Sequence, residues 1–164
     1  MTKPFYSFDT SAFVDWWVRY YPPAILPSLK KQMEGIVQEG RLKASRSVYD
    51  ELEVGGDELF NWVKTYRSEI IVEDDADVQK LARPLIAKYS SPSRPRNGLN
   101  GADPFVIAQA QRNSPTWIVV SGEKGCTVLQ IRGFLWSYAD ESGAVLRNGL
   151  RDLNGLGGSA PFYH

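Results

Sequence analysis

Carboxylates are the side chains best placed to carry chemistry in this sequence, because imidazole and thiol groups are nearly absent. The single histidine is the last residue, His164, and the single cysteine is Cys126. A serine triad, a cysteine–histidine pair, a histidine-rich metal site and an internal disulfide are therefore not expected. If the protein is an enzyme, Asp and Glu must bind metal ions and move protons, with Lys or Tyr as less common substitutes.

Acidic residues adjoin expected strand and helix ends at four separated positions: Asp9, Glu51, Asp103 and Glu123. Asp9 follows the aromatic run at 5–8, and Glu123 follows the apolar run at 116–120. Sheets of parallel strands place their sites at the carboxyl ends of the strands, where these two residues are expected. Glu51 and Asp103 lie on or at the start of expected helices. The fold class alone does not bring all four together.

The elements that must position these acids alternate along the chain. Short apolar runs predict strands at 5–8, 42–45, 70–72 and 116–120, and apolar residues at helical spacing predict helices over 12–18, 26–37, 47–53, 59–66, 78–89 and 103–111. Strands that alternate with helices indicate a parallel sheet covered by helices. We therefore predict an α/β protein with three layers, α/β/α, around a mostly parallel central sheet.

Composition limits the classes of protein further. A chain of 164 residues with 43% hydrophobic residues fits one compact domain with a real core. The charge balance of 19 basic against 19 acidic residues argues against a protein that coats nucleic acid by bulk charge. No apolar run approaches the roughly 18 residues of a membrane span, and the chain opens on no signal-peptide pattern. We expect a cytoplasmic protein with no membrane partner.

Four short segments carry a resemblance to a known family. They are FDTS at 8–11, VYDEL at 48–52, ADPFVIA at 102–108 and VVSGE at 119–123. In this order and spacing they resemble the PIN-domain nucleases, in particular the toxin-like branch related to the VapC toxins of bacterial toxin–antitoxin pairs. The resemblance covers about residues 5–124 and implies a PIN-like version of the predicted α/β/α fold.

The resemblance implies a role for each acidic residue. Asp9, Asp103 and Glu123 would contact Mg²⁺ or Mn²⁺ directly or through water, and Glu51 would hold metal waters or take a proton from the attacking one. Clustered carboxylates repel one another, and a divalent ion with a preference for oxygen ligands makes the cluster stable. Ser11 and Ser121 are expected to orient carboxylates by hydrogen bonds. The number of ions, one or two, stays open.

The function implied is that of a metal-dependent endoribonuclease, a phosphodiester hydrolase leaving a 3′-hydroxyl and a 5′-phosphate. The resemblance further implies three partners, which are an RNA substrate, a cognate antitoxin and a second copy of the chain. Two alternatives remain. One is a catalytically inactive PIN-like scaffold that acts as a binding module, and the other is a nuclease directed at DNA.

The same acidic residues also have structural interpretations. Asp9 could cap the following helix, Asp103 before a proline is an ordinary helix opening, and Glu51 could be a solvated charge. Glu123 could belong to a turn, and Glu53 is the alternative to Glu51 within its helix.

Asp15 and the acidic run at 73–77 are further acidic features of the sequence. Asp15 is an accessory candidate expected to be exposed. The acidic run at 73–77 is interpreted as a helix start with a solvated face.

Cations and aromatic residues suggest contact surfaces. Arg46, Arg94 and Arg96 are candidates for contact with nucleic-acid phosphates, together with Lys43 and Lys88, and a solvated basic loop is the alternative for 94–96.

Trp16 and Trp17 are neighbours, so they cannot both face the protein core from one α-helix. The segment 16–21 and the helix from Leu26 are therefore interface candidates. We divide the chain into a PIN-like nuclease domain at 1–125 and an atypical, partly flexible C-terminal segment at 126–164.

Overall fold

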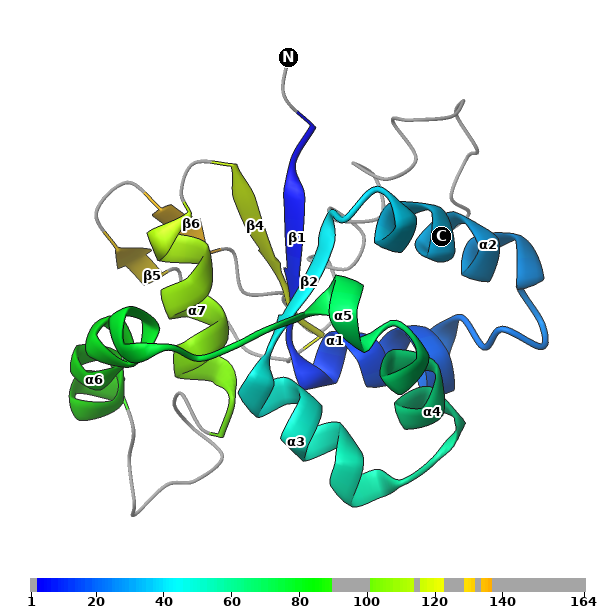
Figure 1. Ribbon diagram of the computed structural model, residues 1–164, viewed down its shortest axis with the longest axis horizontal. Coiled ribbons are helices and arrows are strands. Elements are labelled where there is room, and N and C mark those ends of the chain that lie inside the picture. Colours follow the sequence, from blue (N-terminus) through cyan, green and yellow to red (C-terminus); the bar gives the residue numbers. More distant parts are fainter. Residues whose placement is uncertain (1–2, 90–100, 114–115, 123–128, 132–133, 137–164) are drawn as a thin grey trace.

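The computed structural model describes residues 3–89, 101–113, 116–122, 129–131 and 134–136 (Figure 1). Its strands are β1 (Phe5–Phe8), β2 (Leu42–Ser45), β3 (Ile71–Val72), β4 (Trp117–Val120), β5 (Leu129–Ile131) and β6 (Phe134–Trp136). Its helices are α1 (Thr10–Val14), the π-helix η1 (Asp15–Tyr20), α2 (Pro27–Gln38), α3 (Arg46–Gly55), α4 (Glu58–Thr65), α5 (Arg67–Ile70), α6 (Ala76–Tyr89) and α7 (Asp103–Arg112).

The central sheet has four parallel strands in the order β3-β2-β1-β4. In this register Tyr6 of β1 lies between Leu42 of β2 and Ile118 of β4. Strands β5 and β6 form a separate antiparallel pair. The order reverses at β1, because the chain moves from β1 to β2 and β3 on one side and returns to β4 on the other. All four carboxyl ends lie at one edge of the sheet.

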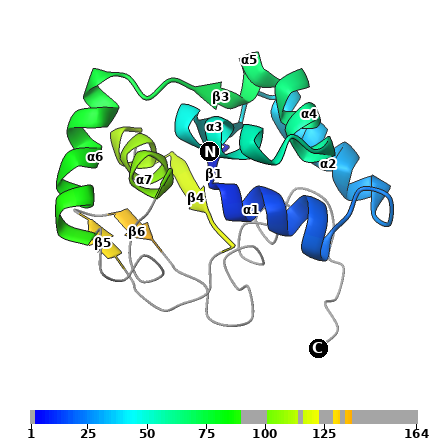
Figure 2. The same cartoon turned by 90° about the horizontal axis from the view of Figure 1, so that it is seen from below.

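Helices cover both faces of the sheet. Connections between parallel strands are right-handed, so the helices between β1 and β3 lie on one face and the helices between β3 and β4 lie on the other. Figure 2 shows this division, with α6 and α7 on one side of β1 and β4 and with α1, α2 and α4 on the other. The predicted three-layer α/β/α fold with a parallel central sheet is confirmed.

The hydrophobic core runs between the sheet and these helices. Consecutive residues of β1 and β4 are buried, as expected for strands of a sheet that is covered on both faces. Tyr6 and Leu42 are each 1% exposed, and Val63 of α4 is fully buried. Burial of this apolar surface is the main favourable contribution to the folding free energy, and the folded sheet positions the acidic residues at its edge.

The first helix differs from the prediction. An α-helix was expected over 12–18, but α1 ends at Val14 and continues as η1. Trp16 is buried and Trp17 is half-buried, and both rings contact Trp62 of α4, at centroid distances of 5.0 and 5.7 Å. The expectation that only one of the two tryptophans packs against the core is therefore wrong. Beyond them, Val18 and Tyr20 are more than half exposed.

The edge strand is shorter than predicted. Ile70 was expected to begin it, but Ile70 is the buried last residue of α5, and only Ile71 and Val72 pair with β2. Among the helices of the described residues, none has the length and apolar character needed to cross a membrane.

Candidate active site

The candidate site lies where the carboxyl ends of β1 and β4 meet. Asp9 follows β1 directly, and its backbone N–H donates to the carbonyl of Val120 at 3.1 Å. Ser121 and Gly122 follow β4 at the same level of the sheet. The strand order reverses between these two strands, and open α/β sheets bind ligands in the crevice at such a reversal.

The carboxylate of Asp9 is buried and held by several donors. The Ser11 hydroxyl lies 2.8 and 2.9 Å from its two oxygens, and the Ser121 hydroxyl donates to Oδ2 at 2.5 Å. The backbone N–H of Ala12 donates to Oδ1 at 2.7 Å, which makes Asp9 the N-cap of α1. The side chain is only 4% exposed. The predicted orientation of a carboxylate by Ser11 and Ser121 is confirmed, and so is the capping interpretation of Asp9.

Glu51 links two segments that are distant in the sequence. The Thr10 hydroxyl donates to its Oε2, and the backbone N–H of Ala102 donates to its Oε1 at 2.8 Å. Thr10 adjoins Asp9, and Ala102 adjoins Asp103. Glu51, although on an exposed part of α3, therefore connects the start of α1 to the start of α7.

A glycine makes this link sterically feasible. Gly101 has a φ of +51°, which L-residues with a side chain rarely adopt, and a Cβ built there would lie 2.1 Å from Glu51 Oε1. Asp103 follows as the first residue of α7 and is half-buried, with Pro104 in the first turn. The predicted helix opening at Asp103 is confirmed.

Asp15 is a member of the site that sequence reasoning placed wrongly. It was expected to be exposed, but it is 2% exposed and forms an ion pair of 2.8 Å with Arg19. Its carboxylate lies against Gly122, where an added Cβ would be 2.0 Å from Asp15 Oδ2. The Gly122 N–H donates to the Ser11 hydroxyl at 2.9 Å. The contact with the β4 end explains the burial, and no local pattern in the sequence reveals it.

One comparison with known proteins bears on this chain. The sequence profile of a protein family described as a domain of unknown function, DUF4411, matches residues 6–131. The chain belongs to the DUF4411 family. The match contains all of β1 except Phe5, strands β2 to β4 and every acidic residue described above. No protein with a curated description matches the chain.

Carboxylates are the candidate metal ligands of this DUF4411 domain. Within the described ranges, no three His, Cys, Asp or Glu side chains gather closely enough to hold an ion. Glu123, the predicted fourth acid, lies outside those ranges. The donors at hand, Asp9 and Asp103 with Glu51 between their segments, are carboxylates, and their chemistry fits Mg²⁺ or Mn²⁺, which prefer hard oxygen ligands. Glu53, the alternative to Glu51, is exposed on α3.

The cations of the DUF4411 domain differ in how far they are already paired. Arg46 forms ion pairs with Asp50 at 2.8 Å and Glu73 at 3.8 Å, and its hydrogen bond to Asp50 raises its pKa. Lys43 donates to the Glu69 carbonyl at 2.7 Å, and partial burial lowers the Lys43 pKa. The predicted phosphate contacts Arg94 and Arg96, and most of segment 126–164, lie outside the described residues.

A half-buried, hydrogen-bonded carboxylate follows β3, where a solvated acidic face was predicted. Asp74 is half-buried and accepts hydrogen bonds from the backbone N–H and the hydroxyl of Ser47, at 2.9 and 2.6 Å. The Gln109 amide donates to its other oxygen at 2.9 Å. Burial raises the Asp74 pKa, against the opposing effect of these hydrogen bonds. The interpretation of the acidic run is correct for Asp75, which caps α6 at Val78, and wrong for Asp74.

Proposed function

We propose that this DUF4411 chain is a metal-dependent endoribonuclease that hydrolyses RNA phosphodiester bonds, and that it acts as the toxin of a toxin–antitoxin pair. The observation that carries the proposal is the hydrogen-bonded frame around Asp9 and Glu51. It supports a site in which the segments of Asp9, Glu51 and Asp103 act together at the reversal point of a parallel sheet. The resemblance of the same segments to the PIN-domain nucleases supplies the reaction class.

The acidic residues would bind the metal, and two serines orient one of them. Asp9 and Asp103, with Glu123, would hold one or two Mg²⁺ or Mn²⁺ ions, which when bound activate water and neutralise charge on the phosphate. Ser11 and Ser121 prevent the Asp9 carboxylate from rotating, so that its oxygens stay in a fixed direction.

Glu51 has a different role in this proposal. It is kept near both acidic segments by Thr10 and Ala102, and a carboxylate in this position can accept the proton of the attacking water. Attack at phosphorus then breaks the bond to the 3′ oxygen and leaves a 3′-hydroxyl and a 5′-phosphate.

A second candidate function has its own observation. Both carboxylate oxygens of Glu51 already accept protein hydrogen bonds, and Asp9 caps α1, so each of these acids has a structural task. This favours a binding module on a nuclease-like scaffold that does not cleave RNA. The two candidates differ in whether hydrolysis depends on Asp9.

A cleavage assay on the full chain separates the candidates. Single-stranded RNA and DNA oligonucleotides of matched sequence are incubated with Mn²⁺ or Mg²⁺, and separately with EDTA. The variants are Asp9→Asn and, as a matched control, Asp74→Asn, which removes the same charge from the other hydrogen-bonded carboxylate after a strand. We expect the parent and Asp74→Asn to cleave RNA. The cleavage rate of Asp9→Asn should fall by more than the roughly 10- to 100-fold that is typical when a residue outside the metal shell is replaced.

Each other result has a definite meaning. A parent that cleaves no faster than Asp9→Asn with either ion contradicts the nuclease proposal and favours the binding module. Cleavage of DNA in preference to RNA identifies the DNA-directed alternative. Growth arrest on expression of the parent in bacteria, absent with Asp9→Asn, tests the toxin assignment separately.

A further inference from the structure

A hollow of about 380 Å³ lies beside the outer strand β3, whereas the candidate active site lies at the ends of β1 and β4. It is formed by the end of α4, by α5, and by β3 with the residue that follows it. Helices α4 and α5 lie next to each other in Figure 1. The lining residues are Lys64, Thr65, Arg67, Ser68, Ile71 and Glu73. A hollow of this size is at the small end of ligand pockets and is large enough for a nucleotide unit.

The two cations of the hollow, Lys64 and Arg67, are oriented by aromatic rings. Lys64 Nζ lies 5.9 Å from the centre of the Phe60 ring, and the Arg67 guanidinium lies 5.1 Å from the centre of the Tyr49 ring. Within the part of the chain that the structure describes, neither of them forms an ion pair with a carboxylate. Both charges are therefore available to an external anion.

Several other described cations are already paired with acidic residues. Arg19 pairs with Asp15 and Arg112 pairs with Asp75, each at 2.8 Å or less. Arg46, which shares the Tyr49 ring with Arg67, is paired with Asp50 and Glu73. The pairing of Glu73 with Arg46 reduces the repulsion that Glu73 would exert on an anion in the hollow.

The polar groups of the hollow suit RNA better than an acidic peptide. A guanidinium and an ammonium bind phosphate oxygens, and the planar guanidinium can do so with two hydrogen bonds. Glu73 is an acceptor that can take a hydrogen bond from a ribose 2′-hydroxyl, a donor that an acidic peptide side chain lacks. The Ser68 and Thr65 oxygens offer further acceptors, since their protons are directed to Glu69 and Asn61.

We infer that this hollow binds a phosphate and the adjoining ribose of an RNA strand, at a distance from the bond that is cut. This inference rests on the proposed function for the identity of its ligand. Lys64 and Arg67 contact the phosphate, and the site contributes binding energy that is independent of base sequence. It thereby lengthens the stretch of RNA that the chain recognises.

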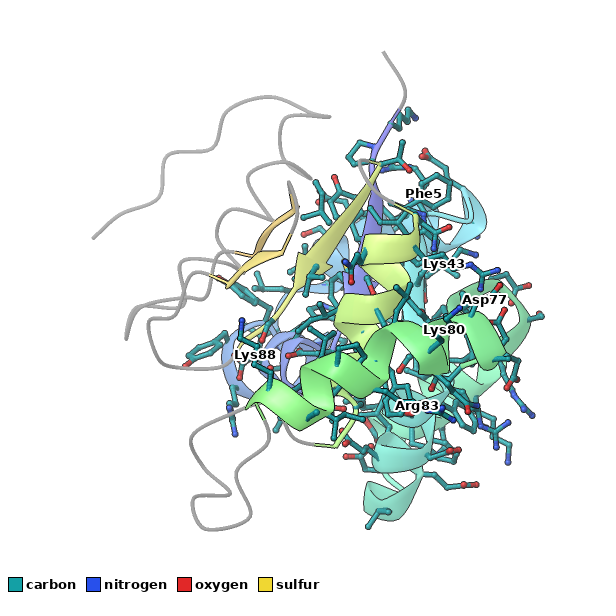
Figure 3. All side chains as sticks on the ribbon, turned by 90° about the vertical axis from the view of Figure 1, so that its left-hand side faces the viewer. Phe5, Lys43, Asp77, Lys80, Arg83 and Lys88 are labelled. Atoms are coloured by element: carbon teal, nitrogen blue, oxygen red, sulfur yellow. The ribbon has the colours of Figure 1, made fainter. Side chains whose placement is uncertain are left out.

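The test measures binding without cleavage. A fluorescent single-stranded RNA is titrated in EDTA with the full chain, at several salt concentrations. The test variant is Lys64→Gln/Arg67→Gln. The control Lys80→Gln/Arg83→Gln removes the same two charges from α6, where Figure 3 labels both side chains. A charge-preserving variant, Lys64→Arg/Arg67→Lys, checks the fold, and so does the thermal midpoint of each variant.

We expect Lys64→Gln/Arg67→Gln to bind RNA on the order of three- to tenfold more weakly at moderate salt. The slope of log K against log salt, which is negative, should become shallower by about 1. The control and the charge-preserving variant should bind like the parent. Equal weakening in the control indicates bulk electrostatics and overturns the inference, and so does unchanged binding in the test variant.

Two arms identify the ligand and separate the two proposals. A polyglutamate peptide that binds the parent more tightly than RNA of matched length would assign the hollow to an acidic protein partner instead. A parent that cleaves RNA but is indifferent to Lys64→Gln/Arg67→Gln in binding removes this site and leaves the nuclease proposal standing. A parent that neither binds nor cleaves RNA overturns both.

Discussion

Two carboxylates of this molecule follow parallel strands and have nearly the same local chemistry. Asp9, after β1, accepts hydrogen bonds from two serine hydroxyls and one backbone N–H. Asp74, after β3, accepts them from Ser47, through its hydroxyl and its backbone N–H, and from the amide of Gln109. The donors to Asp74 come from 27 and 35 positions away, and one donor to Asp9, Ser121, comes from 112 positions away. Hydrogen bonding alone therefore does not distinguish a candidate catalytic acid from a structural one.

Position in the sheet does distinguish them. Asp9 lies between two neighbouring strand ends at the point where the strand order reverses, whereas Asp74 follows the outer strand of the sheet. Around Asp9, the bonds of Glu51 bring in the segment of Asp103 as well. The topology of the sheet, more than the partners of one side chain, makes the Asp9 end the candidate active site.

The largest expected effect on this comparison comes from removing one serine from each carboxylate. Ser121→Ala deletes a donor to Asp9, and Ser47→Ala deletes a donor to Asp74. We expect Ser121→Ala to reduce RNA cleavage roughly 10- to 100-fold, because the freed Asp9 carboxylate can rotate. Ser47→Ala should cleave RNA like the parent. Rate measurements at saturating RNA check this, and equal losses in both variants would abolish the distinction between the two carboxylates.

An intermediate effect tests the link through Glu51. Gly101→Ala places a Cβ 2.1 Å from Glu51 Oε1, so the Glu51 carboxylate must shift, and we expect its hydrogen bond with the Ala102 N–H to weaken. Gly40→Ala is the matched control, because Gly40 also has a positive φ, of +70°, but no atom lies within 4 Å of its added Cβ.

Both glycine variants should lose roughly 1–2 kcal/mol of unfolding free energy from backbone strain, and Gly101→Ala about 1 kcal/mol more. Denaturant unfolding measures these values. Only Gly101→Ala should also cleave RNA more slowly. Equal stability losses in the two variants would show that Glu51 does not stabilise the start of α7.

The smallest effect concerns the pH dependence of stability at Asp74. Burial raises its pKa in the folded chain above that of the unfolded chain. The folded chain therefore holds the proton of the Asp74 carboxyl more tightly than the unfolded chain does. The contribution of this protonation to the unfolding free energy is lost as the pH rises through the raised pKa. Relative to Asp74→Asn, the parent should gain unfolding free energy as the pH falls below the raised Asp74 pKa toward the usual aspartate pKa. Unfolding curves at several acidic pH values check the sign, and a gain in the opposite direction contradicts it.

The sequence predicts the framework of the fold because its signals are local. The run at 5–8 followed by Asp9 marks a strand and a helix cap, and Ser45 likewise caps α3 through Val48. The prediction fails at 70–72, because a short apolar run does not distinguish a helix end from a strand. The π-helix turn at Trp16 and Trp17 is missed for a related reason, since the expected orientation assumed α-helical periodicity.

The candidate site is less predictable because its partners are remote. Asp74 was assigned to a solvated face, and its contacts with Ser47 and Gln109 span 27 and 35 positions. Asp15 was expected to be exposed, and its burial depends on the approach of Gly122. Such contacts depend on tertiary packing, which the spacing of residues along one chain does not encode.

Metal binding at the Asp9 end is the central claim, and a crystal of the full chain soaked in Mn²⁺ tests it most directly. We predict an anomalous peak within about 2.6 Å of an Asp9 carboxylate oxygen, on the side that faces Asp103, and none at Asp74. A well-ordered soaked crystal without a peak at Asp9, or with the Asp9 and Asp103 carboxylates more than about 10 Å apart, would contradict the account, because two ligands of one such ion cannot be so distant.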